Sequence, residues 1–119
     1  MSEQKRVDAE VLFCILKSQH HVEEVLTGFM ELGISGASIL ESKGMAQILT
    51  EQVPIFAGFR SLFAGEGSDS QLIVSVIKTD LVEDAIDLIE EICGDFVVPG
   101  SGIMFTLPVC RVAGLIRNI

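Results

Sequence analysis

The sequence predicts an α+β domain in which a four-stranded antiparallel sheet carries two helices on one face. Two observations predict it. First, VEEVLTGFMELG, which begins at Val22, is repeated in altered form by VEDAIDLIEEICG, which begins at Val82. Second, each copy follows an apolar run, VLFCIL or LIVSVI, and precedes another strand-like segment. The resulting order, β-α-β, connection, β-α-β, is that of a ferredoxin-like fold.

The first half of the chain supplies one strand–helix–strand unit. Residues 11–16 are a short continuous run of strand-forming residues, and the polar residues 1–8 before them are expected to fray. Residues 37–41 are expected to form the second strand. The helix between the two strands has apolar residues at the spacing of one helical face, at Val22, Val25, Leu26 and Phe29.

The second half repeats the unit. Residues 72–77 are expected as a strand, Gly94 ends the following helix, and residues 103–109 are expected as the last strand. Pro108 has no amide proton, so this strand is expected at a sheet edge or to end there. The apolar stripe of the helix is Val82, Ala85, Ile86 and Ile89.

Both faces of the predicted sheet are apolar, since every residue of the 11–16 run is apolar or cysteine. Two helices can cover only one of the faces. The chain of 119 residues reads as a single domain, 1–119, with no other element to cover the second face. Association between copies of the chain is therefore expected, which also fits an apolar content of 49%.

Composition excludes several classes of function. A net charge of −9 disfavours nucleic acid and anionic membranes as partners. No apolar run is long enough to span a bilayer, and the first residues do not resemble a signal peptide, so a cytoplasmic location is expected. The cysteines show no metal-ligand spacing and are expected to be buried free thiols, at Cys14, Cys93 and Cys110.

The connection at 46–70 is too long to be a simple turn. Within it, residues 54–64 predict a short amphipathic helix, which could pack as core, present a surface to a protein target, or lie on a membrane. The membrane alternative is the least favoured, because Arg60 is the only basic residue of the segment. The apolar residues of this helix, which form the candidate partner-binding set, are Ile55, Phe56, Phe59, Leu62 and Phe63.

No catalytic residues and no metal ligands are predicted. His20 and His21 lack the spacing of a metal site, and no histidine is positioned to activate a cysteine. Residues 99–105, PGSGIMF, place a Gly-x-Gly turn before a strand. Such a turn either connects two elements tightly or lets backbone amides cradle an anion.

These segments resemble the PII signal-transduction superfamily over about residues 10–110. GISGAS at 33–38 is similar to the family's Gly-x-x-Gly-x-Thr turn, Lys43-Gly44 to the Lys-Gly that opens its T-loop, and GSGIMF at 100–105 to its B-loop. The B-loop lysine is replaced by Ile103, the arginine that follows the Lys-Gly is missing, and the chain has no tyrosine for T-loop modification.

The resemblance implies a homotrimer that binds an adenine nucleotide between subunits and controls a protein target, such as a membrane transporter or a metabolic enzyme, through the 46–70 T-loop. With fewer cations, AMP, ADP or a cyclic nucleotide is favoured over ATP. The implied ligand residues are Gly36, Ser38, Gly44, Met45, Gly100, Ser101, Gly102 and Ile103.

Other functions remain open at this point. A PII-like protein that has lost nucleotide binding would keep the fold and the trimer. A CutA-like trimer with a metal-related role would share the fold but needs a cluster of Cys, His or acidic ligands. An acylphosphatase-like enzyme needs an arginine in a phosphate loop after the first strand, where this chain has Lys17, Ser18 and Gln19.

Overall fold

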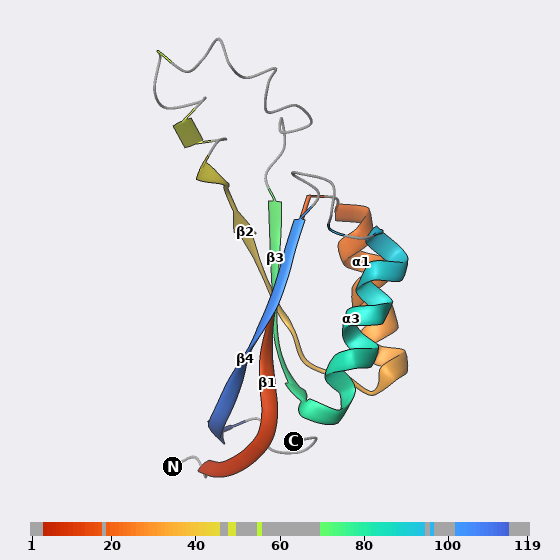
Figure 1. Cartoon of the computed structure of the whole chain (residues 1–119), viewed down its shortest axis with the longest axis vertical. Coiled ribbons are helices and arrows are strands. Elements are labelled where there is room, and N and C mark those ends of the chain that lie inside the picture. Colours follow the sequence, from red (N-terminus) through yellow and green to blue (C-terminus); the bar gives the residue numbers. More distant parts are fainter. Residues whose placement is uncertain are drawn as a thin grey trace.

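A computed structural model describes residues 4–17, 19–45, 48–49, 55, 70–94, 96 and 102–114. Its strands and helices follow the order β-α-β-β-α-β that the repeat predicted (Figure 1). The elements are β1 (Gln4–Leu16), α1 (Gln19–Leu32), β2 (Ser38–Ser42), β3 (Ser70–Lys78), α3 (Thr79–Cys93) and β4 (Gly102–Ala113).

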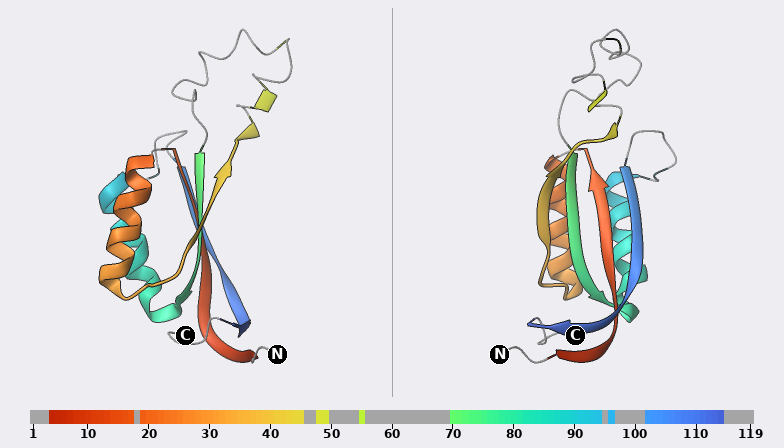
Figure 2. Two further views of the ribbon diagram at one scale, coloured as in Figure 1. Left: turned by 180° about the vertical axis from the view of Figure 1, so that it is seen from behind. Right: turned by 90° about the vertical axis from the view of Figure 1, so that its left-hand side faces the viewer.

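The four strands form one sheet in the order β2-β3-β1-β4, and every neighbouring pair is antiparallel. Helices α1 and α3 lie side by side on one face of this sheet (Figures 1 and 2). The predicted α+β fold with two helices on one face is therefore confirmed. β4 is an edge strand, as Pro108 required, because a residue without an amide proton cannot complete a central ladder. No helix of the described part is long and apolar enough to cross a bilayer.

The core lies between the helices and the sheet. The helical stripes point into it as predicted: Val25 and Phe29 of α1 and Ala85 and Ile89 of α3 are almost fully buried. From the sheet, alternate residues of two central strands face the helices, because side chains of a strand alternate between faces. They are Leu12, Cys14 and Leu16 of β1, with Ile73 and Ile77 of β3.

Two strands are longer than the sequence indicated. Residues 4–8, which fall in the segment expected to fray, belong to β1, and β4 continues beyond residue 109 to Ala113. The two extensions pair with each other, from Gln4 with Ala113 to Arg6 with Arg111. Hydrogen bonding to a distant partner therefore orders a polar segment whose own sequence carries no strand pattern.

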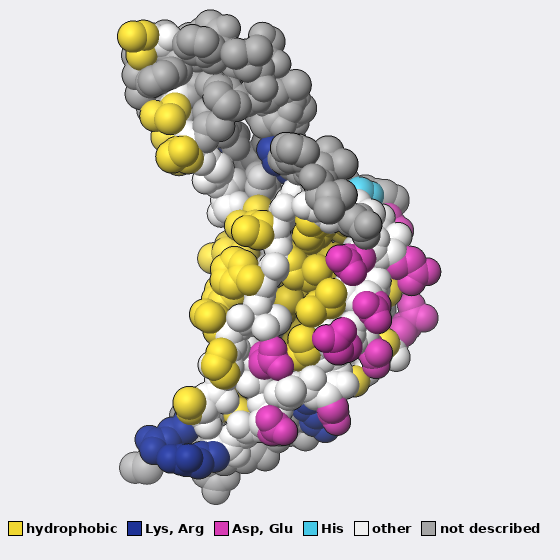
Figure 3. All heavy atoms as spheres, in the orientation of Figure 1, with side chains coloured by type: hydrophobic (Ala, Val, Ile, Leu, Met, Phe, Trp, Pro, Cys, Tyr) yellow, Lys and Arg dark blue, Asp and Glu magenta, His cyan; other side chains and the backbone are white. Residues whose placement is uncertain are grey.

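The other face of the sheet is apolar and uncovered by any described element; we call it the open face. At its centre the rings of Phe13 and Phe105 stack with centroids 5.0 Å apart. Four of its side chains are 44–53% exposed: Leu40, Ile103, Phe105 and Leu107. Figure 3 shows hydrophobic side chains gathered along this side of the sheet. By register the open face comprises Leu40 of β2, Leu72, Val74 and Val76 of β3, Val11, Phe13 and Ile15 of β1, and Ile103, Phe105 and Leu107 of β4.

Candidate functional site

The candidate site begins at one end of the sheet, which we call the loop end. Here β1 and β2 finish, while β3 and β4 begin. The register aligns these ends: Leu16 lies opposite both Gln71 and Gly102, and Ser42 lies opposite Ser70. Both long connections, 43–69 from β2 to β3 and 94–101 from α3 to β4, lead into a strand that begins at this end. The topology therefore places the bases of the two loops that the sequence singled out on one side of the molecule.

Gly102 occupies the first position of β4, opposite the last residue of β1, Leu16. Its φ of +146° is a backbone conformation that side chains disfavour, and a Cβ atom placed there would lie 2.5 Å from the carbonyl oxygen of Ile15. The Gly-x-Gly pattern thus marked a position where glycine is needed. The structure supplies a reason within the chain itself, the close approach of β4 to β1.

We expect Gly102→Ala to lower the free energy of unfolding by about 1–3 kcal/mol, because both the backbone conformation and the contact with Ile15 become strained. Urea unfolding followed by circular dichroism measures it. Gly44→Ala is the matched control, since nothing lies within 4 Å of a Cβ atom built at Gly44. Equal stability of the two variants would contradict the strain argument.

Gly44 and Met45 lie at the base of the 46–70 connection and are open to solvent. Met45 is 77% exposed, and the Gly44 carbonyl accepts a hydrogen bond of 3.1 Å from the amide of Ile48. Within the described residues nothing lies within 4 Å of a Cβ atom built at Gly44, so none of them blocks a ligand from its backbone. Gly44 and Met45 are therefore the most accessible of the predicted ligand residues that the structure describes.

Gly36 and Ser38 lie away from that base. Ser38 begins β2 and faces Val74 in the middle of β3, while Ser42 at the other end of the strand faces Ser70. The Gly36 carbonyl accepts a 2.6 Å hydrogen bond from the hydroxyl of the buried Ser75. This bond anchors the turn before β2 to the central strand, so Gly36 has a structural role.

The predicted ligand residues are divided between the two edges of the sheet. Gly44 and Met45 follow the edge strand β2, whereas Gly102 and Ile103 begin the opposite edge strand β4. With about 4.8 Å between neighbouring strands, the two groups are about 14 Å apart across the sheet. One chain does not bring them into contact.

Several predicted residues lie outside the described part of the structure. They are Gly100 and Ser101 of the ligand set, and Phe56, Phe59, Leu62 and Phe63 of the partner-binding set. The predicted helix at 54–64 also lies outside the described residues, except for Ile55. Ile55, the described member of the partner-binding set, is 75% exposed.

Two cations at the loop end were not among the predicted site residues. Lys17 follows β1 and Lys43 follows β2, so both come directly after strands that finish here. The signal was present in the sequence, because a lysine comes directly after each of these strand segments. Only the register shows that the two lysines belong to one end of the sheet.

The thiols do not form a reactive centre. Burial raises the pKa of the Cys14 thiol to about 12, with a smaller contribution from Cys93. Burial and then the Glu24 carboxylate raise the pKa of Cys93. Both thiols are therefore protonated at neutral pH. Cys110 is exposed, so the prediction of three buried thiols was wrong at this edge-strand position. The described residues contain no cluster of three or more His, Cys, Asp or Glu side chains able to hold a metal.

The sheet order, the two helices on one face and the long connection at the loop end define a PII-like fold, so the fold that the resemblance implied is confirmed. Arabidopsis thaliana PII, crystallised with citrate, matches with a TM-score of 0.59 at 20% identity over 87% of this chain and 79% of its own. The apo form of CPII from Thiomonas intermedia K12, a nitrogen regulatory PII-like protein, matches with a TM-score of 0.61 at 16% identity over 96% of this chain and 99% of its own. Neither a protein-family model nor a curated protein sequence matches the chain.

Proposed function

We propose that this chain is a PII-like regulatory protein rather than an enzyme: a cytoplasmic homotrimer that binds a small ligand between subunits and signals through the 46–70 connection. The observation that carries the proposal is the open face. An apolar sheet face of this extent is unfavourable in water, and in a regulator of this fold it is the surface on which subunits meet.

The division of the predicted ligand residues supports a site between copies. Gly44 and Gly102 lie on opposite edges of one sheet, so one copy cannot enclose a ligand with both. In a ring that joins unlike surfaces, copies that pack through their open faces can bring the β2 edge of one copy to the β4 edge of the next. The two halves of the site then come together in each cleft.

The charges of the loop end support a ligand with few phosphates. Lys17 and Lys43 are the described cations there, and Ile103 stands where the resembling family has a lysine. Backbone amides of Gly44 and Gly102 can hold one phosphate group, while several adjacent phosphates would need more cations in a chain of net charge −9. AMP, ADP or a cyclic nucleotide is therefore the proposed ligand class.

The 46–70 connection is the proposed output element. It leaves the sheet directly after Gly44 and Met45, so a ligand held there contacts its base. A ligand with different affinities for two arrangements of the connection shifts the population between them. The exposed Ile55 and the phenylalanines that follow it would then present an apolar surface to a protein target, a transporter or a metabolic enzyme.

Calorimetric titration with ATP, ADP, AMP and cyclic AMP tests the ligand. We expect heat of binding with a monophosphate or diphosphate, and a weaker affinity, by about tenfold or more, in Gly44→Val, whose side chain would block the exposed backbone. Thr27→Val, on the outer surface of α1, should bind as the unmodified protein does. Absence of heat with all four nucleotides would refute nucleotide binding. The alternative of a PII-like protein that has lost nucleotide binding would then be supported.

A further inference from the structure

The helical layer carries an unusual distribution of charge. Neither α1, QHHVEEVLTGFMEL, nor α3, TDLVEDAIDLIEEIC, contains a lysine or arginine. Figure 3 shows acidic side chains gathered over the helices. We call this surface the acidic layer. Its carboxylates are Glu23, Glu24 and Glu31 of α1, with Asp80, Glu83, Asp84, Asp87, Glu90 and Glu91 of α3.

The placement of these carboxylates opposes helix stability. Glu31 lies in the last turn of α1, and Glu90 and Glu91 lie in the last turn of α3, with no basic residue in either turn. A negative charge at the C-terminal end of a helix costs about 0.3–1 kcal/mol, because it faces the negative end of the helix dipole. These carboxylates do not stabilise the helices that carry them. A positively charged partner would offset their unfavourable interaction with the helix dipoles.

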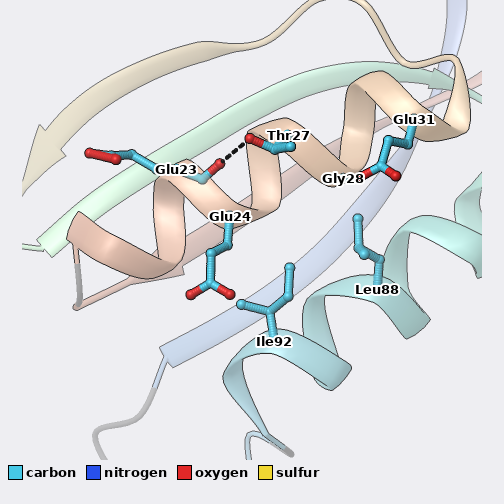
Figure 4. Close-up of a pocket in the computed structure, with 7 residues that line it drawn as sticks. All are labelled: Glu23, Glu24, Thr27, Gly28, Glu31, Leu88 and Ile92. Atoms are coloured by element: carbon cyan, nitrogen blue, oxygen red, sulfur yellow. Dashed lines mark hydrogen bonds between the residues drawn. The ribbon is translucent and has the colours of Figure 1, made fainter.

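Between the two helices the acidic layer is hollowed into a groove of about 380 Å³ (Figure 4). Glu24, Gly28 and Glu31 fall on one stripe of α1, and Leu88 and Ile92 of α3 form the apolar side. Gly28 keeps the helices close, since a Cβ atom there would lie 2.8 Å from Cδ1 of Leu88. The groove therefore has an apolar floor between two carboxylates that are two helical turns apart.

The chain also carries a basic element that projects from the sheet. β3 pairs with β1 only from Ala9 to Leu16, so among the described strands residues 4–6 of β1 pair with residues 111–113 of β4 alone. A register shift between Arg6 and Ala9 bends this two-stranded ribbon aside, as the lower ends of β1 and β4 show in Figure 2. We call residues 4–6 and 111–113 the basic arm. A ribbon of two strands is marginal alone in water, so it is expected to need a contact.

Two exposed arginines of the basic arm face each other. Arg6 and Arg111 are direct partners in the register, so their side chains share one face of the ribbon. Like charges directly opposite one another on neighbouring strands destabilise the pair. No ion pair within the described residues neutralises either guanidinium. Carboxylates or similar anions that approach this face would offset the repulsion between the two guanidinium groups.

We propose that the basic arm of one copy of this chain docks on the groove of the acidic layer of another copy, with Arg6 and Arg111 pairing with Glu24 and Glu31. Within one chain this contact does not form, because the basic arm turns to the side of the sheet away from the helices (Figures 1 and 2). Each copy carries both of these complementary surfaces. A second copy of the same chain is therefore the partner that binds the groove. Arginine and carboxylate form paired, directional hydrogen bonds, which suits this contact.

The acidic layer is separate from the open face. Helices α1 and α3 lie on the opposite side of the sheet, so copies that pack through their open faces leave the acidic layer accessible. The contact joins unlike surfaces and strengthens association either around a ring of copies or between rings. It is electrostatic, so it weakens as salt screens the charges.

A charge-swap series with the full chain tests the proposal, with the dissociation constant between copies measured by mass photometry and sedimentation velocity at low salt. Arg6→Glu/Arg111→Glu and, separately, Glu24→Arg/Glu31→Arg are each expected to weaken association by about tenfold or more. The variant with all four substitutions keeps the net charge of −9 and restores complementarity. It is expected to return to within about threefold of the unmodified protein.

The matched control combines Arg6→Glu/Arg111→Glu with Glu83→Arg/Asp84→Arg. It has the same net charge, and its new arginines lie on the acidic layer outside the groove. It is expected to remain weakened. Full rescue by this control, no rescue by the four-substitution variant, or unchanged association of the arm variant would each overturn the proposal. Circular dichroism verifies folding, and Glu24→Gln/Glu31→Gln replaces the reversed pair if that pair unfolds. Nucleotide titration is read separately, so failure here leaves the proposed ligand site untouched.

Discussion

Phe105→Glu is expected to convert the assembled protein into monomers. Phe105 lies at the centre of the open face, stacked on Phe13, and is 44% exposed in the single chain. Packing of copies through this face would bury its carboxylate replacement among apolar side chains, at a cost of several kcal/mol. In light scattering at micromolar concentration, the unmodified protein should show three times the chain mass of 12.9 kDa and the variant one.

The variant should still fold, because the core lies on the other side of the sheet. Met30→Glu is the matched control: Met30 is 67% exposed on α1, outside the open face, and its replacement should remain trimeric. A monomeric unmodified protein, or a trimeric Phe105→Glu variant, would show that the open face is not the surface of association.

The second large effect concerns alkaline pH. Burial raises the pKa of the Cys14 thiol from 9.0 to about 12, because a thiolate is poorly solvated in the core. Protonation of the Cys14 thiol therefore stabilises the folded state. This stabilisation is complete below pH 9 and is lost as the pH rises toward 12. The difference corresponds to about 4 kcal/mol in the free energy of unfolding.

Urea unfolding at intervals from pH 8 to pH 11.5 measures this loss. The chain has no tyrosine, so no phenol ionises in this window. Cys14→Ala should be less stable at pH 8, since it leaves a small cavity, but its stability should fall less steeply with pH. Cys110→Ala, at an exposed position, should retain the full slope. Equal slopes for Cys14→Ala and the unmodified protein would refute the assignment.

The core elements were predictable because their patterns are local. The stripe of Val25 and Phe29 in α1 and that of Ala85 and Ile89 in α3 follow from a period of 3.6 residues, and both stripes are buried. The start of α3 was predicted less well: Asp80 and Glu83 suggested a capping box, but the helix begins at Thr79, after Lys78, without a side-chain cap. Strand ends depend on the partner strand, which is why residues 4–8 were missed.

The candidate site was predictable in part. The Gly-x-Gly pattern pointed to Gly102, yet the approach of the Ile15 carbonyl explains that glycine without a ligand. Lys17 and Lys43 stand 26 positions apart in sequence and come to one end of the sheet only through the register. The facing arginines, Arg6 and Arg111, were invisible for the same reason, since 105 positions separate them.

The sequence by itself determined the order of elements, the two helical faces and the surplus of apolar strand residues, because periodicity and propensity are properties of neighbouring residues. Only the tertiary structure decided where that surplus lies: on one open face, with the candidate ligand residues divided between the edges of the same sheet. It also separated the charges into an acidic layer and a basic arm. Pairing between distant strands sets these positions, and no local pattern records which strands will pair or in which register.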